Sequence, residues 1–457
     1  MTSNSKFKQL FKMTPAKMIL LTFFGLILVG SFLLCLPVSS ADGEWTPYID
    51  ALFSSTSSVC VTGLMTIDIA SELSLFGEFV TLILIQVGGL GFVTMTAFVF
   101  MIIGKKINYQ TRITLQEAFN KDENSGVVKT VIHVLIITGV CELLGFFALA
   151  PSMIEFSGDF WSGCFKALFL SVSAFCNAGI DPLGRGTADF SNLSFFVGNP
   201  FVLIPVMCLI VLGGIGFVVI LDIVNRPKKN KKLSLHTKIV LWMTLILILL
   251  GAFVFMAAEW NNKATIGNLG TFDKVVNSFF QSITTRTAGF TTIDQSAMTD
   301  ISFMVSTFLM FIGGSPVSIA GGIKTTTFFV ILLFISKNQD QNGNIIYKSK
   351  RISQKVLSKA LKITLIAASL LLVGTALVFV FEGGDCSIDS VIYEVMSAIC
   401  TVGLSFGITS SLSVVSKLTL IILMYIGRIG MLTIPLAFKT KETGTAIEYA
   451  NAKIIVG

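Results

Sequence analysis

Residues 388–404, IDSVIYEVMSAICTVGL, join a short apolar stretch to the glycine-containing pentapeptide Cys400-Thr-Val-Gly-Leu404. Three similar pentapeptides precede it in the chain: Cys60-Val-Thr-Gly-Leu64, Cys176-Asn-Ala-Gly-Ile180 and Arg286-Thr-Ala-Gly-Phe290. Their glycines are 116, 110 and 114 residues apart, and an aromatic residue lies seven positions before the start of each pentapeptide. Spacing this regular predicts four copies of one structural unit.

The composition places this unit in a membrane. Hydrophobic residues make up 53% of the 457 residues and charged residues 13%, and the mean hydropathy is +0.82. This apolar content exceeds what a soluble core needs. Runs of about 20 apolar residues, which can cross a bilayer as helices, occur near residues 18–36, 75–103, 127–150, 199–224, 236–258, 301–335, 361–381 and 413–435.

Each unit therefore contains a span, a half-span, a glycine loop and a second span. We predict an all-α integral membrane protein with eight spans, in which four pseudo-fourfold repeats surround one central pore. The repeats are predicted at 18–104, 127–225, 236–336 and 353–436, between an N-terminal segment 1–17 and a C-terminal segment 437–457.

The basic residues orient the spans. Of the 33 Lys and Arg, 25 fall in the two terminal segments and in the stretches 105–129, 226–238 and 337–362. By the positive-inside rule these segments face the cytoplasm, so we predict a protein of the cell membrane with both termini in the cytoplasm. The net charge of +7 then reflects membrane topology, and no basic stripe interleaved with aromatic residues indicates nucleic acid. The cysteine and histidine spacing predicts neither a metal site nor a disulfide framework, and no cofactor is expected.

The half-spans begin with helix-capping chemistry. Thr46, Asp159, Thr271 and Asp389 are the expected N-cap residues. A helix of roughly ten to fifteen residues is about 15 to 22 Å long. Each half-span is therefore expected to enter the membrane without crossing it.

The glycine loops predict a cation-selective filter. Non-helical backbone at membrane depth is tolerated where it is buried in protein or lines a watery cavity, so the four loops are expected to meet around one axis. Rings of carbonyl oxygens there would replace the hydration shell of an ion, and the negative ends of four half-helices would favour a cation. The expected ion-binding residues are Val61, Thr62, Gly63, Asn177, Ala178, Gly179, Thr287, Ala288, Gly289, Thr401, Val402 and Gly403.

A second glycine pattern lies in the span after each filter loop. It reads Gly88-Gly-Leu-Gly-Phe92, Gly213-Gly-Ile-Gly-Phe217, Gly313-Gly-Ser-Pro316 and Gly427-Arg-Ile-Gly-Met431. Close packing of the inner spans explains these glycines at least as well as contact with an ion does.

With these motifs, residues 18–435 resemble the Trk/Ktr/HKT superfamily of potassium transporters, and in particular its KtrB-type ion-translocating subunits. Thr401-Val402-Gly403 is similar to the filter core of potassium channels, and the chain lacks the two additional spans usual in Trk-type relatives. The resemblance implies potassium selection by a glycine in all four loops. It also implies homodimers, a cytoplasmic ring of nucleotide-binding regulatory subunits, and sodium as an activator of uptake.

The resemblance further implies a mobile gate loop below the filter, which corresponds to residues 313–327. Glycines, serines and a proline in this segment also disfavour a continuous helix. The expected gate residues are Gly313, Gly314, Ser315, Pro316, Gly321, Gly322, Lys324 and the pore-facing Arg428. For Lys324, an ammonium that snorkels to the cytoplasmic interface is a slightly better interpretation than a gating role.

Several alternatives accompany this interpretation. Cys60, Cys176 and Cys400 are expected to pack behind the filter, and Arg286 to pair with an extracellular-side acid. Because the first three loops are degenerate, a sodium-preferring or weakly selective cation pore remains the alternative function. A voltage-gated channel would need an arginine-rich sensor span, and an enzyme would need a catalytic motif such as GxSxG; the sequence contains neither.

Overall fold

The computed structural model describes residues 15–91, 127–184, 190, 192–229, 232–336, 344–348 and 350–431. The predicted cytoplasmic termini, apart from residues 15–17, lie outside these residues. So do the end of the first predicted repeat, the last residues of the final predicted span and much of the basic segments that orient the chain.

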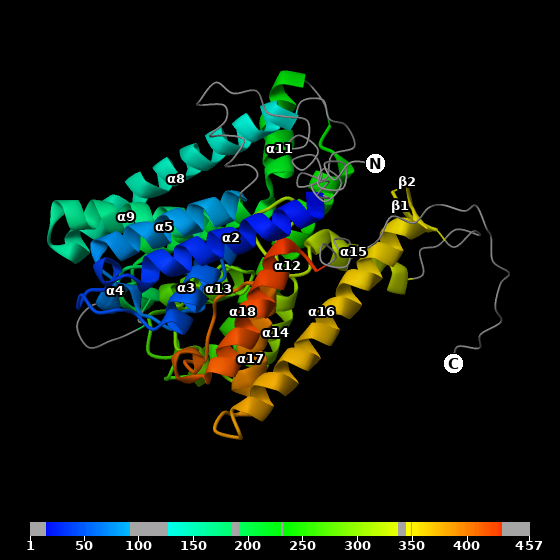
Figure 1. Cartoon of the computed structure of the whole chain (residues 1–457). Coiled ribbons are helices and arrows are strands. Elements are labelled where there is room, and N and C mark those ends of the chain that lie inside the picture. The colour runs from blue at the N-terminus through cyan, green and yellow to red at the C-terminus, as the bar shows by residue number, and fades with distance from the viewer. Residues whose placement is uncertain are drawn as a thin grey trace, which may run out of the picture.

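Long apolar helices open the four predicted repeats. They are α2 (Pro15–Cys35), α8 (Val127–Ser157), α12 (Leu235–Glu259) and α16 (Gln354–Phe381). Within the described ranges these four are long and apolar enough to cross a membrane, and a bent pair described below would make a fifth span. The protein is thus a helical, multi-pass membrane protein (Figure 1).

A half-helix of 13 to 16 residues follows each long helix and ends at the pentapeptide, as predicted. These are α3 (Tyr48–Cys60), α9 (Phe160–Phe175), α13 (Thr271–Thr284) and α17 (Ile388–Cys400). Each packs against the long helix that precedes it in the chain. They are too short to span the ~30 Å hydrocarbon layer.

Only one of the four expected N-caps of these half-helices is correct. The carboxylate of Asp159 accepts from the N–H of Ser162, but Pro47 and Gly270 occupy the other N-cap positions next to Thr46 and Thr271 without a side-chain bond. In the fourth repeat Ser387, and not Asp389, caps the helix. Local sequence offers two or three adjacent candidates, and the angle at which the chain enters the helix decides among them.

The second helix of each repeat returns through the fold. These helices are α5 (Leu75–Leu90), α10 (Pro200–Ile215), α14 (Asp300–Phe311) and α18 (Val414–Ile429). Each begins with a side-chain cap, from Ser74, Asn199, Thr299 and Ser413 respectively.

These second helices end or bend where the predicted spans continue. Gly91, Gly216 and Gly430 have positive φ angles of 81°, 96° and 100° directly after α5, α10 and α18, a conformation that glycine adopts at little cost. At Gly216 the chain turns by 96° into α11 (Phe217–Lys229). The span predicted near 199–224 is therefore not one straight helix. In the third repeat, residues 312–324 are non-helical between α14 and α15 (Thr325–Ile335), so the predicted interruption at 313–327 is correct except for its last three residues.

The remaining elements are short. They are α4 (Ile69–Glu72), the 3-10 helices η1 (Pro37–Ser39), η2 (Asn192–Phe196), η3 (Gln295–Ala297) and η4 (Thr409–Ser411), and the strands β1 (Ile345–Tyr347) and β2 (Lys350–Ile352). The two strands form an antiparallel hairpin in which Ile345 pairs with Ile352. This hairpin departs from the all-α expectation, and it packs on α15 and α16 through Ile345 and Ile352.

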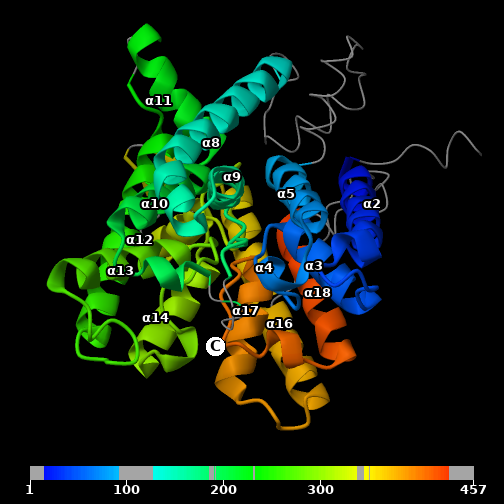
Figure 2. The same ribbon diagram turned by 90° about the vertical axis from the view of Figure 1, so that its left-hand side faces the viewer.

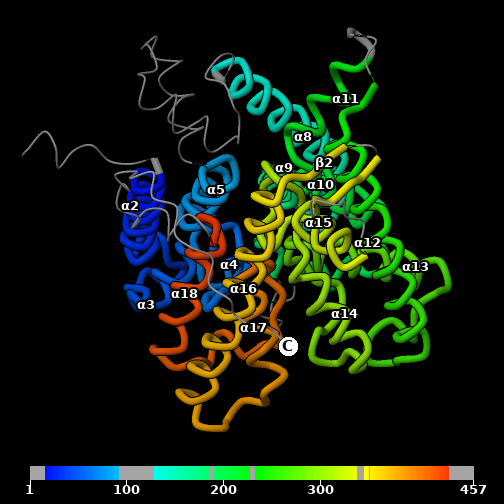
Figure 3. The backbone as a smooth tube through the Cα atoms, turned by 90° about the vertical axis from the view of Figure 1, so that its right-hand side faces the viewer, coloured from blue at the N-terminus to red at the C-terminus, as the bar shows by residue number. Residues whose placement is uncertain are grey.

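Helices of the four predicted repeats contact one another in a ring. The second helix of each repeat contacts the half-helix of the next: α5 with α9, α10 with α13, α14 with α17 and α18 with α3. Two views at right angles to Figure 1 place α18, from the last repeat, beside α2 and α3, from the first (Figures 2 and 3). Here Lys417 Nζ lies 2.7 Å from Asp50 Oδ1, and the Tyr425 hydroxyl donates to the carbonyl of Leu20 at 2.6 Å.

Candidate functional site

Each predicted filter loop leaves its half-helix through the same backbone turn. The second pentapeptide residue has a left-handed φ in all four loops: 54° at Val61, 55° at Asn177, 68° at Thr287 and 49° at Thr401. Three of these side chains are β-branched, which makes the conformation unusual. The glycine two positions later also has a positive φ in every loop. Four different sequences thus adopt one strained geometry, which the sequence pattern alone does not indicate.

The four glycines bring the loops into contact in a closed circle. A Cβ added to Gly63 would lie 2.5 Å from the carbonyl oxygen of Ala178 in the second loop. The same addition at Gly179 would lie 2.6 Å from Ala288 O, and at Gly289 2.5 Å from Val402 O. A Cβ on Gly403 would meet Thr62 O and so return to the first loop. Only glycine fits at these four positions.

A hydroxyl near the end of each half-helix holds the loop in place. Ser57 Oγ accepts from Gly63 N at 3.0 Å, and Ser397 Oγ accepts from Gly403 N at 2.9 Å. In the second loop Ser173 Oγ accepts from Ile180 N at 3.1 Å, whereas Thr284 Oγ1 donates to Phe290 O at 2.6 Å in the third. Sequence reasoning missed these residues. Their signal is a Ser or Thr two or three positions before each pentapeptide.

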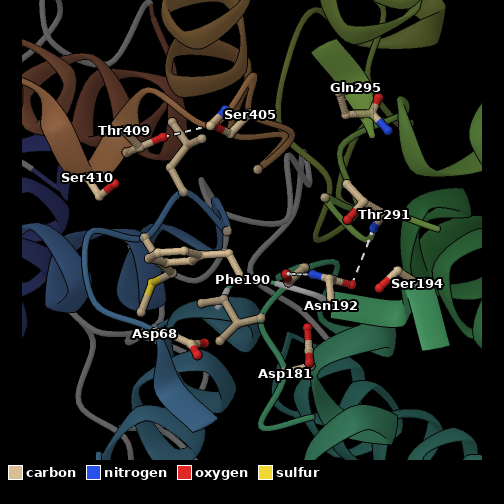
Figure 4. Close-up of a pocket in the computed structure, with 18 of the residues that line it drawn as sticks. Asp68, Asp181, Phe190, Asn192, Ser194, Thr291, Gln295, Ser405, Thr409 and Ser410 are labelled. Carbon is tan, nitrogen blue, oxygen red and sulfur yellow. Dashed lines mark hydrogen bonds between the residues drawn. The ribbon is translucent and has the colours of Figure 1, made fainter. Parts of the chain in front are cut away.

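A cavity of about 460 Å³ opens on one side of the four filter glycines and is lined by all of them. Asp68, Asp181 and Asp294 contribute carboxylates to its wall, and Figure 4 shows the first two near one another. Burial raises the pKa of Asp181 to about 7; the N–H of Leu183 opposes this shift and the charge of Asp68 adds to it. The cavity wall is therefore acidic, with one carboxylate that titrates near neutral pH.

The non-helical segment of the third repeat packs against the other side of the filter. A Cβ on Gly321 would collide with Thr401 Oγ1 and Cys400 O, and one on Gly313 would lie 3.1 Å from Thr287 Cγ2. Two of the predicted gate residues, Gly313 and Gly321, thus lie directly against the third and fourth predicted filter loops.

Three cationic side chains donate to backbone carbonyls of this segment. Arg286 Nη2 donates to Gly313 O at 3.3 Å, Arg428 Nη1 donates to Ile319 O, and Lys324 Nζ donates to Ala320 O. Arg428 also reaches the first repeat, where its Nη2 donates to Gly88 O and, at 3.0 Å, to Gly89 O.

Two expectations about these cations are wrong. Among the described residues Arg286 has no carboxylate partner, because its buried guanidinium turns toward the interrupted span rather than toward the acidic cavity. The ammonium of Lys324 bends back onto its own loop instead of snorkelling away from it.

Glycines and cysteines behind the filter serve close packing, as expected. A Cβ on Gly88, Gly213 or Gly427 would collide with the carbonyl of Val59, Phe175 or Ile399 at the end of a half-helix. Cys60, Cys176 and Cys400 are each fully buried beside these contacts.

Known proteins match this chain over almost its whole length. The family model "TrkH: Cation transport protein" matches residues 6–449. The chain is 37% identical to the potassium/sodium uptake protein NtpJ of Enterococcus hirae, over 98% of each chain. It is 35% identical to the Ktr system potassium uptake protein B of Bacillus subtilis, over 98% of this chain and 97% of that protein.

A solved structure has the same fold. The crystal structure of the potassium transporter TrkH from Vibrio parahaemolyticus superposes with a TM-score of 0.70 at 17% identity, over 92% of this chain and 84% of that one. A full-length family match, relatives above 30% identity and the shared fold lead to one conclusion. This chain belongs to the TrkH family of cation transport proteins and is a transporter, not an enzyme.

Proposed function

We propose that this protein takes up potassium across the cell membrane through a pore formed by the four filter loops. The observation that carries the proposal is the closed circle of contacts among Gly63, Gly179, Gly289 and Gly403. In each loop φ is positive at the second and fourth pentapeptide positions but not at the third. This alternation allows successive carbonyls to face the same side, as coordination of a dehydrated cation requires.

Charge supports a cation as the transported ion. All four half-helices end at the filter, so the negative ends of their dipoles point at the circle of glycines. Acidic residues line the cavity next to it. The names of the relatives favour potassium over other cations, and so does glycine in all four loops, by the resemblance to potassium transporters.

The proposed pore requires a particular arrangement of repeats in the membrane. Residues 18–104, 127–225, 236–336 and 353–436 form the four repeats, their eight spans surround one pore, and both termini lie in the cytoplasm. The broken second spans cross the membrane as bent or interrupted elements.

We also propose that the segment 313–327 gates the pore. It lies against the filter, and three cations bind its carbonyls at Gly313, Ile319 and Ala320. These positive charges oppose the passage of a cation while the segment is in place. Opening then requires the segment to leave Arg286 and Arg428.

Regulation would come from other chains. Relatives named as B and D proteins of Ktr systems support a partnership with a cytoplasmic nucleotide-binding ring subunit, and we propose a homodimer that docks on such a ring. Sodium is the proposed activator, because one relative is named a potassium/sodium uptake protein. That name also keeps a sodium-preferring or weakly selective pore as the second candidate function.

Rubidium tracer uptake tests the proposal. The chain is expressed in bacterial cells that lack their own potassium uptake, with and without a regulatory ring subunit and external sodium. We expect saturable uptake that potassium competes and that collapses in Gly403→Ser. Gly25→Ser is the matched control, because a Cβ at Gly25 meets nothing within 4 Å. Sodium uptake that exceeds rubidium uptake would favour the second candidate. Absence of both, with the ring subunit present, would refute the assignment.

A further inference from the structure

A buried carboxylate lies behind the fourth filter loop, at a half-helix position where the other three repeats have no carboxylate. Glu394 directly follows the aromatic residue that recurs in each half-helix, and its counterparts in the other repeats are Ser54, Leu170 and Phe280. Its side chain is fully buried in α17. A carboxylate without solvent needs several hydrogen-bond donors.

All the donors to Glu394 come from the segment that leaves the filter. Its Oε1 accepts from the Ser405 hydroxyl and, at 3.2 Å, from the N–H of Phe406. Its Oε2 accepts from Thr409 Oγ1 at 3.1 Å. Ser405 and Thr409 are themselves 3.0 Å apart, as the dashed line in Figure 4 shows. One side chain therefore fixes residues that begin two positions after Gly403.

The neighbouring residue Tyr393 holds the same segment from a second direction. Its ring stacks on Phe406 with centroids 4.2 Å apart. Its hydroxyl donates to Gln295 Oε1 at 2.9 Å, and Gln281 Nε2 donates to the same oxygen at 2.6 Å. The exit of the fourth loop is thus attached both to its own half-helix and to the third repeat.

We propose that Glu394 is a positioning residue for ion selectivity: by accepting three hydrogen bonds from residues 405–409, it fixes the spacing of the carbonyls at Thr401–Gly403. This inference rests on the proposed potassium pore. A filter whose loop is held apart cannot contract around a smaller cation, whereas a released loop can. Loss of the acceptor should therefore weaken the discrimination of rubidium from sodium more than it weakens the rate of uptake.

A graded set of variants tests this role. Glu394→Ala removes both oxygens, whereas Glu394→Gln keeps one carbonyl acceptor of the same size. Ser405→Ala combined with Thr409→Val removes two of the three donors without touching α17. Glu382→Gln is the matched control, because Glu382 also accepts from a backbone N–H and a hydroxyl, those of Ser413 at 3.0 and 2.8 Å, but lies outside the filter.

The readouts are rubidium uptake, its KM and its inhibition by sodium, at equal amounts of protein in the membrane. We expect the rubidium-to-sodium preference to fall about tenfold in Glu394→Ala, which corresponds to 1.4 kcal/mol. The preference of Glu394→Gln and that of the double variant should lie between those of Glu394→Ala and the wild type. The preference of Glu382→Gln should match that of the wild type.

Two outcomes would overturn the inference while leaving the pore intact. One is that Glu394→Ala reaches the membrane and keeps the wild-type rubidium-to-sodium preference. The other, which decides the case if Glu394→Ala does not fold, is an unchanged preference in the double variant. A wild-type chain that transports no rubidium would instead refute the proposed function itself.

Discussion

At the residue scale, adding a single methyl group to a filter glycine would cause a collision with the next loop. A Cβ at Gly179 would lie 2.6 Å from Ala288 O and 2.7 Å from the Cα of Gly289, and neither backbone atom can move without shifting a filter loop. The positive φ of Gly179 adds roughly 1–2 kcal/mol of strain for alanine.

Gly179→Ala should therefore lower rubidium uptake by about tenfold or more, since 1.4 kcal/mol corresponds to a factor of ten. Gly139→Ala on α8 is the control, because a Cβ at Gly139 meets nothing within 4 Å. Tracer uptake at matched expression measures both. Equal uptake by the two variants would contradict the circle of contacts.

Asp181 should make uptake depend on external pH. Because burial raises its pKa to about 7, the side chain is ionised above pH 7 and becomes neutral as the pH falls through 7. The cavity then loses a negative charge next to the filter, which weakens its attraction for a cation by about 1 kcal/mol. We expect the rubidium KM to rise about fivefold between pH 8 and pH 6.

Two variants separate this effect from a general acid effect on uptake. Asp181→Asn should have a high KM at both pH values. Asp42→Asn should keep the wild-type pH dependence, because the hydroxyl of Ser40 lowers the pKa of Asp42, so that Asp42 stays charged throughout. A pH dependence that survives in Asp181→Asn would rule out this carboxylate as the titrating group.

At the element scale, the interrupted span of the third repeat is held by a residue of the third filter loop. Arg286 is buried, and its hydrogen bond to Gly313 O joins two segments 27 residues apart. A hydrogen bond from a charged group contributes about 1.5–3 kcal/mol. Removing it should shift residues 313–324 toward release.

Arg286→Met should accordingly raise the maximal rate of rubidium uptake about three- to tenfold without the regulatory subunit, with little change in KM. Arg286→Lys, which keeps a charged donor, should stay near the wild type. Initial rates over a range of rubidium concentrations distinguish the two. A slower Arg286→Met present at normal levels would show that Arg286 supports the filter rather than restraining the segment.

Periodicity and length predicted most of these elements, since the half-helices end where the pentapeptides begin. The sequence could not reveal the 96° turn at Gly216, because Gly-Gly-Ile-Gly also occurs in straight, closely packed membrane helices. Nor could it assign a partner to Arg286, whose acceptor is a backbone carbonyl that no side-chain pattern marks. The left-handed φ at Val61 and Thr401 likewise depends on the neighbouring loops.

At the scale of the whole molecule, the first and last repeats are far apart in the sequence and are held together by non-covalent contacts. The ion pair of Lys417 with Asp50 at 2.7 Å lies at this contact, and both side chains are largely buried, with exposures of 10% and 19%. The sequence indicated four repeats but not which side chains close them into a ring. That pairing spans 367 residues.

Lys417→Met should destabilise the folded protein by about 1.5–3 kcal/mol, because it leaves the Asp50 carboxylate without its charged donor. Thermal unfolding of the purified protein in detergent measures the change. The exchanged pair Asp50→Lys with Lys417→Asp should recover part of the loss, and Lys263→Met, on an exposed loop, should have no effect. Identical midpoints for Lys417→Met and Lys263→Met would mean that the ion pair does not hold the ring closed.

The four filter loops belong to one polypeptide, and this has a consequence for how such a protein can change. In an assembly of four identical subunits, any mutation of the filter appears four times. Here a mutation changes one loop at a time. Ion preference can therefore change gradually while the other three loops preserve transport. A feature such as the single carboxylate of Glu394 can therefore arise in one quadrant only. Gene duplication followed by divergence would leave this kind of asymmetric record.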